Sequence, residues 1–216
     1  MNDFSWLIDK LYYLPGIFVG LSFHEFAHAL AAYSMGDDTA KRAGRLTVDP
    51  RAHIDLFGFA ALLFAGFGWA KPVPINPWSF KKRRTGTIIV SIAGPLMNMI
   101  IALITLITIY VVFNIIGYDN DIIYRIFSGI FFVNIVLCVF NLIPLPPLDG
   151  SKILASFLPG NMEAKLYELE RYSYLVLLVL IFTNILDKIL DPMVMFLVTL
   201  LDDIVYYLFV LFGLLN

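Results

Sequence analysis

Long, nearly uncharged apolar stretches constrain this chain more than any other feature of its sequence. A helix that crosses a bilayer needs about 20 mostly apolar residues. The chain offers six candidate stretches, at residues 11–35, 54–70, 85–118, 126–148, 172–186 and 192–216. The sequence therefore predicts an all-α protein, a polytopic helix bundle with about five or six transmembrane helices.

The composition of the chain supports this class. Hydrophobic residues make up 60% of it and charged residues 15%, and its mean hydropathy is +0.82. Soluble domains have about 45–50% apolar and about 25% charged residues, so a soluble globular domain is excluded. A net charge of −2 offers no basic face for nucleic acid. We expect residues 1–216 to form a single integral-membrane domain in a lipid bilayer.

Three of the stretches depart from a simple spanning helix. Residues 54–70 are short, rich in Gly and Ala, and flanked on both sides by Lys and Arg. Such residues collect on the cytoplasmic side, so we predict a re-entrant segment that bends at its glycines, with the N-terminus outside. Prolines predict non-helical chain at residues 144–148. The last stretch carries Asp202 and Asp203, so it either spans or lies at the interface.

The first stretch contains His24, Glu25 and His28 in the pattern H-E-x-x-H. Residues four apart share one face of a helix, so the two imidazoles can hold one metal ion. Zinc in such a site lowers the pKa of its bound water to about 7, and a neighbouring carboxylate takes the proton during attack on a carbonyl. A polar cluster that only packs helices is disfavoured, because burying these groups in lipid is costly. The H-E-x-x-H pattern therefore predicts a zinc site that hydrolyses peptide bonds.

A catalytic zinc also needs a third protein ligand and one open position. The candidates are His53 and Asp149. His53 lies between Arg51 and Asp55 in a polar stretch that we expect to be solvated, where a surface or structural role is more common. Asp149 follows the proline-rich stretch, and non-helical chain at membrane depth is tolerated only where protein buries it or water reaches it. We predict Asp149 as the ligand; the alternative is that it only caps a short helix.

The two halves of this predicted site agree in depth. His28 lies eight residues before Gly36, which is about 12 Å at 1.5 Å per residue. Asp149 lies three residues before Lys152. Both therefore lie toward the cytoplasmic side. If the chain had the opposite orientation in the membrane, both residues would lie toward the other side. The agreement of their depths therefore does not depend on which side is the cytoplasm.

Five motifs, taken in order, resemble those of the site-2 protease family, the zinc metalloproteases that cut within membranes. They are HEFAH at residues 24–28, GRLTVDP at 44–50, GWAKPVP at 68–74, AGPLMN at 93–98 and NLIPLPPLDG at 141–150. The resemblance covers about residues 15–160. Larger members carry an inserted PDZ domain or a CBS pair, which this chain lacks, so we expect no regulation through those modules.

The resemblance implies an intramembrane zinc endopeptidase with one zinc ion per chain. Its substrates would be membrane-anchored proteins, cut in or near a transmembrane segment. We expect a multi-pass protein of the prokaryotic cell membrane with its active site toward the cytoplasm. By the resemblance, the site residues are the zinc ligands His24, His28 and Asp149, the general base Glu25, and the polar helpers Asn98 and Asn141.

Physical arguments leave two interpretations open for each of the polar helpers. Asn98 shares a helical face with Gly94 and lies near Ser91, so it can reach the site or form part of a seam where helices pack. Asn141 can donate to a developing oxyanion or cap the unwound stretch. The three prolines of residues 71–80 predict an extended loop, which can align a substrate strand or serve as a connector.

Two other classes of function compete with hydrolysis. A zinc or proton-coupled transporter would also place His, Glu and Asp in the membrane. It is disfavoured because no internal repeat is visible and because hydrolysis, not binding, needs Glu25. A catalytically silent membrane adaptor would not need His24, Glu25, His28 and Asp149 to be intact together.

Overall fold

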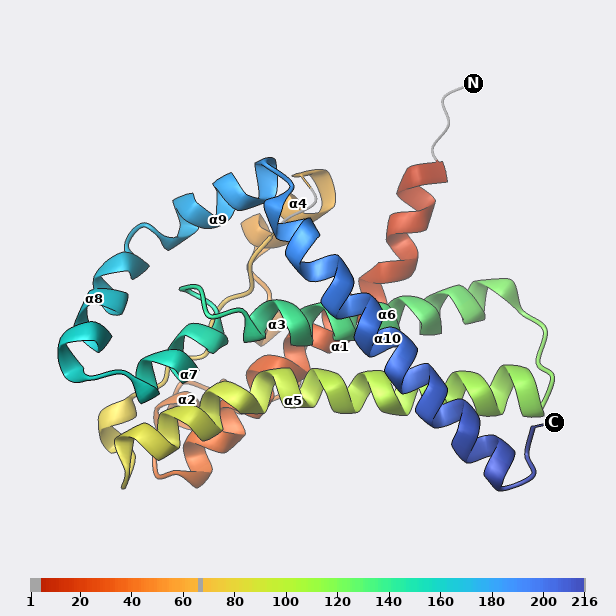
Figure 1. The fold of residues 1–216 in the computed structure, drawn as a ribbon, viewed down its shortest axis with the longest axis horizontal. Helices are drawn as coiled ribbons and strands as arrows, with labels where there is room; N and C mark the ends of the chain where they lie inside the picture. Colours follow the sequence, from red (N-terminus) through yellow and green to blue (C-terminus); the bar gives the residue numbers. More distant parts are fainter. Residues whose placement is uncertain (1–4, 66–67, 216) are drawn as a thin grey trace.

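The computed structural model describes residues 5–65 and 68–215, which form helices and no strand (Figure 1). This confirms the all-α class for the described chain. In order, the elements are α1 (Ser5–Ser34), α2 (Thr39–Arg42), α3 (Pro50–His53), α4 (Leu56–Ala65), the 3-10 helix η1 (Pro77–Ser79), α5 (Arg83–Ile109), the π-helix η2 (Tyr110–Ile115), α6 (Asp121–Leu142), α7 (Asp149–Phe157), α8 (Gly160–Glu170), α9 (Ser173–Phe182) and α10 (Ile185–Leu211).

Helices α1, α5 and α6 pack against one another, and α10 lies across α5 and α6 (Figure 1). Glycines allow α1 and α6 to approach closely, since a Cβ on Gly16 would lie 2.8 Å from the carbonyl oxygen of Gly129. In lipid, where the surroundings are as apolar as the side chains, close packing of this kind is what holds helices together. Buried apolar residues of α5, η2, α6 and α10 form a common core: Ala102, Leu106, Ile109, Tyr110, Phe131, Ile135, Val139, Val194 and Val205.

Three helices of the described chain are long and apolar enough to cross a membrane: Arg83–Ile115, which joins α5 to η2, then α6 and α10. Helix α1 has 30 residues, but polar residues interrupt its apolar sequence. The predicted five or six spanning helices are thus not reached in residues 5–65 and 68–215.

The C-terminal third explains much of this difference. The stretch 172–186 holds α9, which ends at Phe182, and α10 begins at Ile185 instead of Pro192. Asn184 between them has a φ of 54°, a left-handed conformation that ends a helix. Helix α9 has 10 residues, about 15 Å, which is half of a hydrocarbon core of about 30 Å. The predicted fifth spanning helix is therefore too short to cross.

The two ends of the stretch 54–70 lie side by side. An isolated bridge joins Ile54 to Ala70, and the amide of Lys71 donates to the carbonyl of His53 at 2.8 Å. Helix α4 lies between these ends. Residues 66 and 67, where part of the bend was predicted, lie outside the described residues. The ends of the segment meet, as a re-entrant path requires.

Residues 143–148 join α6 to α7 without helical backbone, which confirms the predicted non-helical stretch at 144–148. The turn is tight, since a side chain on Gly150 would collide with the carbonyl of Leu142. Helix α7 packs on α5, and its first residue is Asp149. The turn therefore brings Asp149 to the helix against which α1 also packs.

Candidate metal centre

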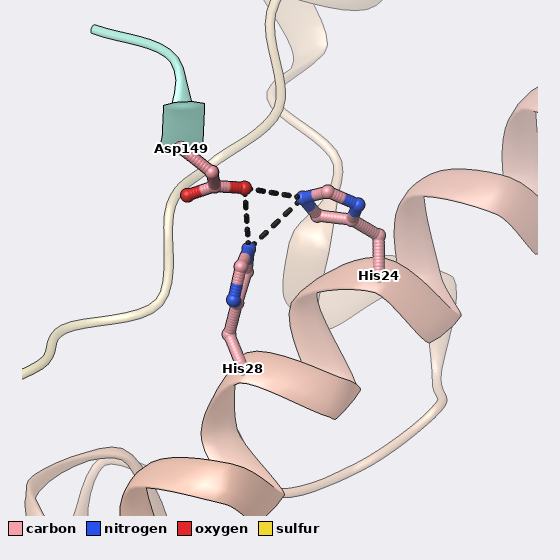
Figure 2. A group of neighbouring side chains, drawn as sticks. All are labelled: His24, His28 and Asp149. Atoms are coloured by element: carbon pink, nitrogen blue, oxygen red, sulfur yellow. Dashed lines mark hydrogen bonds and ion pairs between the residues drawn. The ribbon is translucent and has the colours of Figure 1, made fainter. Parts of the chain in front are cut away.

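His24 and His28 lie one turn apart on α1, and Asp149 reaches both from the start of α7 (Figure 2). Each of these residues is 5% exposed. His28 Nε2 lies 2.9 Å from His24 Nε2 and 2.9 Å from Asp149 Oδ2. His24 Nε2 lies 3.2 Å from the same oxygen. We call these three residues the His-His-Asp cluster; it brings together segments 121 residues apart.

The other ring nitrogen of each histidine is bound to a group that accepts hydrogen bonds. His28 Nδ1 lies 2.7 Å from the carbonyl oxygen of Val90, and His24 Nδ1 lies 2.6 Å from Asn98 Oδ1. Because these oxygens only accept, each Nδ1 carries the ring proton. In a neutral imidazole, Nε2 then holds a lone pair. Two lone pairs and a carboxylate oxygen at these distances require a cation among them, either a proton or a metal ion.

The donor atoms of the cluster suit zinc. Bond lengths of about 2.0–2.1 Å in a tetrahedral site place the donors about 3.3 Å apart, close to the observed 2.9–3.2 Å. Two neutral nitrogens and one carboxylate leave the fourth position open, as catalytic zinc requires. The buried cluster could therefore hold a metal ion.

Gly94 of α5 lies directly against both imidazoles. A Cβ built on Gly94 would lie 2.5 Å from His24 Cε1 and 2.5 Å from His28 Nε2. Ser91 and Asn98, on the same face, are buried. The face that the sequence predicted for these residues is therefore the one that contacts the histidines, and Asn98 touches His24 itself.

The second carboxylate oxygen of Asp149 faces a cation. Its Oδ1 lies 3.2 Å from Lys152 Nζ, which holds the carboxylate in place. A cavity of about 190 Å³ adjoins the cluster and leaves room for water. It is lined by His28, Val73, Ile75, Pro77, Phe80, Thr87, Val90, Ser91, Asp149 and Lys152.

Glu25 follows His24 on α1 and faces the returning chain after residue 70. Its Oε2 accepts a hydrogen bond of 2.8 Å from the amide of Val73. Val73 is buried against Ala29 and Ala40. Residues 71–76 contain no helix or strand, as a loop requires, but η1 interrupts the predicted loop 71–80. The carboxylate of Glu25 thus also holds the segment that lies over it.

Two buried charged residues hold the same segment, residues 71–76. Arg45 Nη2 donates to the carbonyl of Lys71 at 2.5 Å, and Asp37 Oδ2 accepts from the amide of Asn76 at 2.6 Å. Burial raises the pKa of Asp37, but the hydrogen bonds from Thr39 and Asn76 outweigh it and hold this pKa below its usual range. Burial lowers the pKa of Arg45, although Glu25 opposes the shift. We call Asp37, Arg45 and His53 the loop clamp.

His53 belongs to the loop clamp and is not a solvated residue. The prediction that it lies in a solvated stretch was wrong, because His53 is 0% exposed and the returning chain at Lys71 covers it. Its Nε2 lies 2.7 Å from the carbonyl of Thr47, and its Nδ1 lies 3.4 Å from Arg45 Nη2. One nitrogen donates and the other accepts, so neither has a lone pair free for a metal.

Two asparagines of α6 differ from expectation. Asn141 donates to the carbonyl of Leu137 in its own helix at 2.9 Å. No hydrogen bond of the described chain joins it to the cluster, so its part in catalysis stays a prediction.

Asn134 was missed by the sequence analysis. It is 0% exposed and accepts a hydrogen bond from Asn98. A polar residue within the apolar stretch 126–148 was the signal, since such groups must find partners in lipid.

Known proteins match this chain over most of its length. The model of peptidase family M50 matches residues 12–123 and 118–184. Two relatives carry the name "Putative zinc metalloprotease". YwhC of Bacillus subtilis is 42% identical over 189 residues, which are 84% of this chain and 85% of YwhC. Rip2 of Mycobacterium tuberculosis is 32% identical over 174 residues, which are 77% of this chain and 65% of Rip2. No solved structure matches.

Proposed function

This chain belongs to peptidase family M50, the site-2 protease family of zinc metalloproteases, and from that premise we propose that it hydrolyses peptide bonds in or near transmembrane segments of membrane-anchored proteins. The observation that carries the proposal is the buried His-His-Asp cluster beside Glu25. Its two Nε2 atoms and one carboxylate oxygen converge within 3.2 Å of one another, and such a set of atoms needs a cation among them. The transporter and adaptor alternatives gain no support from a specific feature of the described chain.

We propose that His24, His28 and Asp149 hold one zinc ion per chain. When bound, the ion polarises a carbonyl and lowers the pKa of its water to about 7. The protein orients the three ligands before any metal enters: Val90 and Asn98 hold the imidazoles, and Lys152 holds the carboxylate. Because Gly94 has no side chain, the space beside both Nε2 atoms stays free.

Glu25 is proposed as the general base. Its Oε2 is held by the Val73 amide at 2.8 Å, which leaves Oε1 to accept the proton of the attacking water. Asn141 is proposed as a hydrogen-bond donor to the developing oxyanion, and it would exchange its bond to Leu137 for that contact. The cavity beside His28 and Asp149 supplies room for water and for a peptide bond.

The proposed placement is the prokaryotic cell membrane, with the site toward the cytoplasm. Helices α5, α6 and α10 are the candidate spans, with α1 as a fourth and residues 54–70 as a re-entrant segment. Four basic residues in a row, at 81–84, lead into α5, which favours a cytoplasmic start. A substrate segment must unwind locally at the site, because helical peptide bonds are closed to attack.

The test is Glu25→Gln, compared with Glu168→Gln on α8 as a matched control. We expect Glu25→Gln to abolish cleavage of a single-span reporter protein in vesicles while its zinc content stays that of wild type. Glu168→Gln should cleave normally, since residue 168 is exposed. Retained cleavage by Glu25→Gln would sink the general-base role. Zinc flux into vesicles without cleavage by wild type would favour the transporter.

A further inference from the structure

A chain of side-chain hydrogen bonds runs from the His-His-Asp cluster into the interface of α1, α5 and α6. His24 Nδ1 lies 2.6 Å from Asn98 Oδ1, and Asn98 Nδ2 lies 2.9 Å from Asn134 Oδ1. Both asparagines are 0% exposed. These hydrogen bonds link His24, a proposed zinc ligand on α1, to Asn134 on α6 through Asn98 on α5.

Backbone carbonyls fix the direction of each proton in this chain. Asn134 Nδ2 lies 2.8 Å from the carbonyl of Ile130, and Asn98 Nδ2 lies 3.0 Å from that of Gly20. A carbonyl oxygen only accepts, so both amide nitrogens must face these carbonyls. Asn134 Oδ1 then accepts from Asn98, and Asn98 Oδ1 accepts from His24. The ring proton of His24 is therefore on Nδ1, and its lone pair is on Nε2 in the cluster.

Asn134 provides the second acceptor that the Asn98 amide needs. The amide has two N–H donors, and the carbonyl of Gly20 and the oxygen of Asn134 use both. If Asn98 rotated by half a turn, its oxygen would face two other oxygens and its N–H would face His24. That arrangement selects the tautomer of His24 with its proton on Nε2. Two acceptors, the Gly20 carbonyl and Asn134 Oδ1, oppose this rotation of the Asn98 amide more strongly than the Gly20 carbonyl alone would.

We propose that Asn134 is a positioning residue for metal binding, which acts through Asn98 to keep His24 Nε2 free as a ligand. The inference rests on the proposed function, because it takes His24 as a zinc ligand. Partners of the second ring nitrogen fix the tautomer and orientation of histidine ligands, and their loss lowers metal affinity about 10–100-fold. Asn134 lies one residue further out than Asn98, so we expect a loss of about tenfold, at the lower end of that range.

A role in packing alone makes a different prediction. Asn134 also fills space between helices, since a Cβ on Gly20 would lie 3.2 Å from its Oδ1. Asn134→Leu keeps the branched shape of the side chain without a hydrogen bond, whereas Asn134→Asp keeps an oxygen acceptor for Asn98. If only packing mattered, the leucine variant would bind zinc no worse than the aspartate variant.

The experiment uses the full chain in detergent, labelled with ¹⁵N-histidine, which gives only three imidazoles. We expect the Nδ1 proton on His24 in metal-free wild type, and partial loss of this proton in Asn134→Leu. Zinc affinity, measured by competition with a chromophoric chelator, should fall about tenfold in Asn134→Leu. Asn134→Asp should keep near-wild-type values. So should the control Thr105→Val, which removes a buried hydroxyl bonded within α5.

Several outcomes would overturn the inference. One is a wild-type His24 without a proton on Nδ1, which needs no variant to fold. Others are wild-type zinc affinity in Asn134→Leu, or an equal loss in Thr105→Val. His24→Ala separates these failures from failure of the proposed function. If His24→Ala keeps its zinc, the ligand assignment fails; if it loses zinc while Asn134→Leu does not, only the role of Asn134 fails.

Discussion

His28 and His53 are both buried, and each donates a ring proton to a backbone carbonyl, but their second nitrogens face opposite charges. His28 Nε2 faces the carboxylate of Asp149 at 2.9 Å. His53 Nδ1 faces the guanidinium of Arg45 at 3.4 Å. The first arrangement attracts a cation, and the second already has one.

The comparison separates a proposed metal ligand from a structural histidine better than burial does. Both side chains are nearly inaccessible, with 5% and 0% of their surface exposed. The distinction lies in whether the second nitrogen keeps a free lone pair, and in the sign of the charge beside it. The two regions still cooperate, because the loop clamp holds the chain whose Val73 amide binds Glu25.

The largest effect expected is the difference in zinc binding between a variant of the His-His-Asp cluster and a variant of the loop clamp. Asp149→Ala should lower zinc affinity by more than about 100-fold, beyond the range for outer partners of a ligand. His53→Ala should keep its zinc but lose about 1–3 kcal/mol of stability, because buried partners are left unpaired. Metal analysis and thermal unfolding of both variants test this. Full zinc in Asp149→Ala with loss in His53→Ala would reverse the comparison.

The next effect concerns the space beside the imidazoles. Gly94→Ala places a methyl group 2.5 Å from ring atoms of both histidines, so the rings must move. We expect zinc affinity to fall about 10–100-fold, as when ligand orientation is lost. Gly160→Ala on α8 is the matched control, since a Cβ there meets no atom within 4 Å. Equal zinc binding by the two variants would show that the cluster tolerates displacement.

The smallest effect expected lies in the loop clamp and depends on pH. The pKa of Asp37 is held below its usual range, so its contribution to stability is present above the unfolded pKa and is lost as the pH falls below about 4. Asp37→Asn should cost about 1 kcal/mol at neutral pH, and the gap to wild type should close in acid. Unfolding midpoints at several pH values measure it. A gap that widens in acid would contradict the assignment.

The spacing of His24 and His28 was enough to predict their shared face, because a helix repeats every 3.6 residues. Prolines were likewise enough to predict the non-helical chain before Asp149. Spacing placed Asn98 on a face that can reach the site, but it did not decide whether Asn98 does so, and it could not show that Val90 meets His28. These contacts depend on how two helices cross, which no local pattern encodes.

The failed predictions have physical reasons as well. His53 lies in a polar stretch, and its burial depends on chain that returns from residue 70 to cover it. Apolar composition predicted that residues 172–186 avoid water, but not that α9 ends at Phe182. Composition indicates whether a segment prefers lipid or water. Turns decide where a helix ends, and packing decides which residues other segments bury.

The 121 residues between His28 and Asp149 also separate them in time. A ribosome adding about 5–20 residues per second makes Asp149 about 6–24 s after His28. During that interval the nascent chain has two imidazoles and no carboxylate to complete the cluster. Helix α7 must then fold back onto α5 before all three donors meet. On the proposed assignment of the cluster as the active site, the nascent chain is inert until α7 has been made, and a chain truncated before α7 never becomes active.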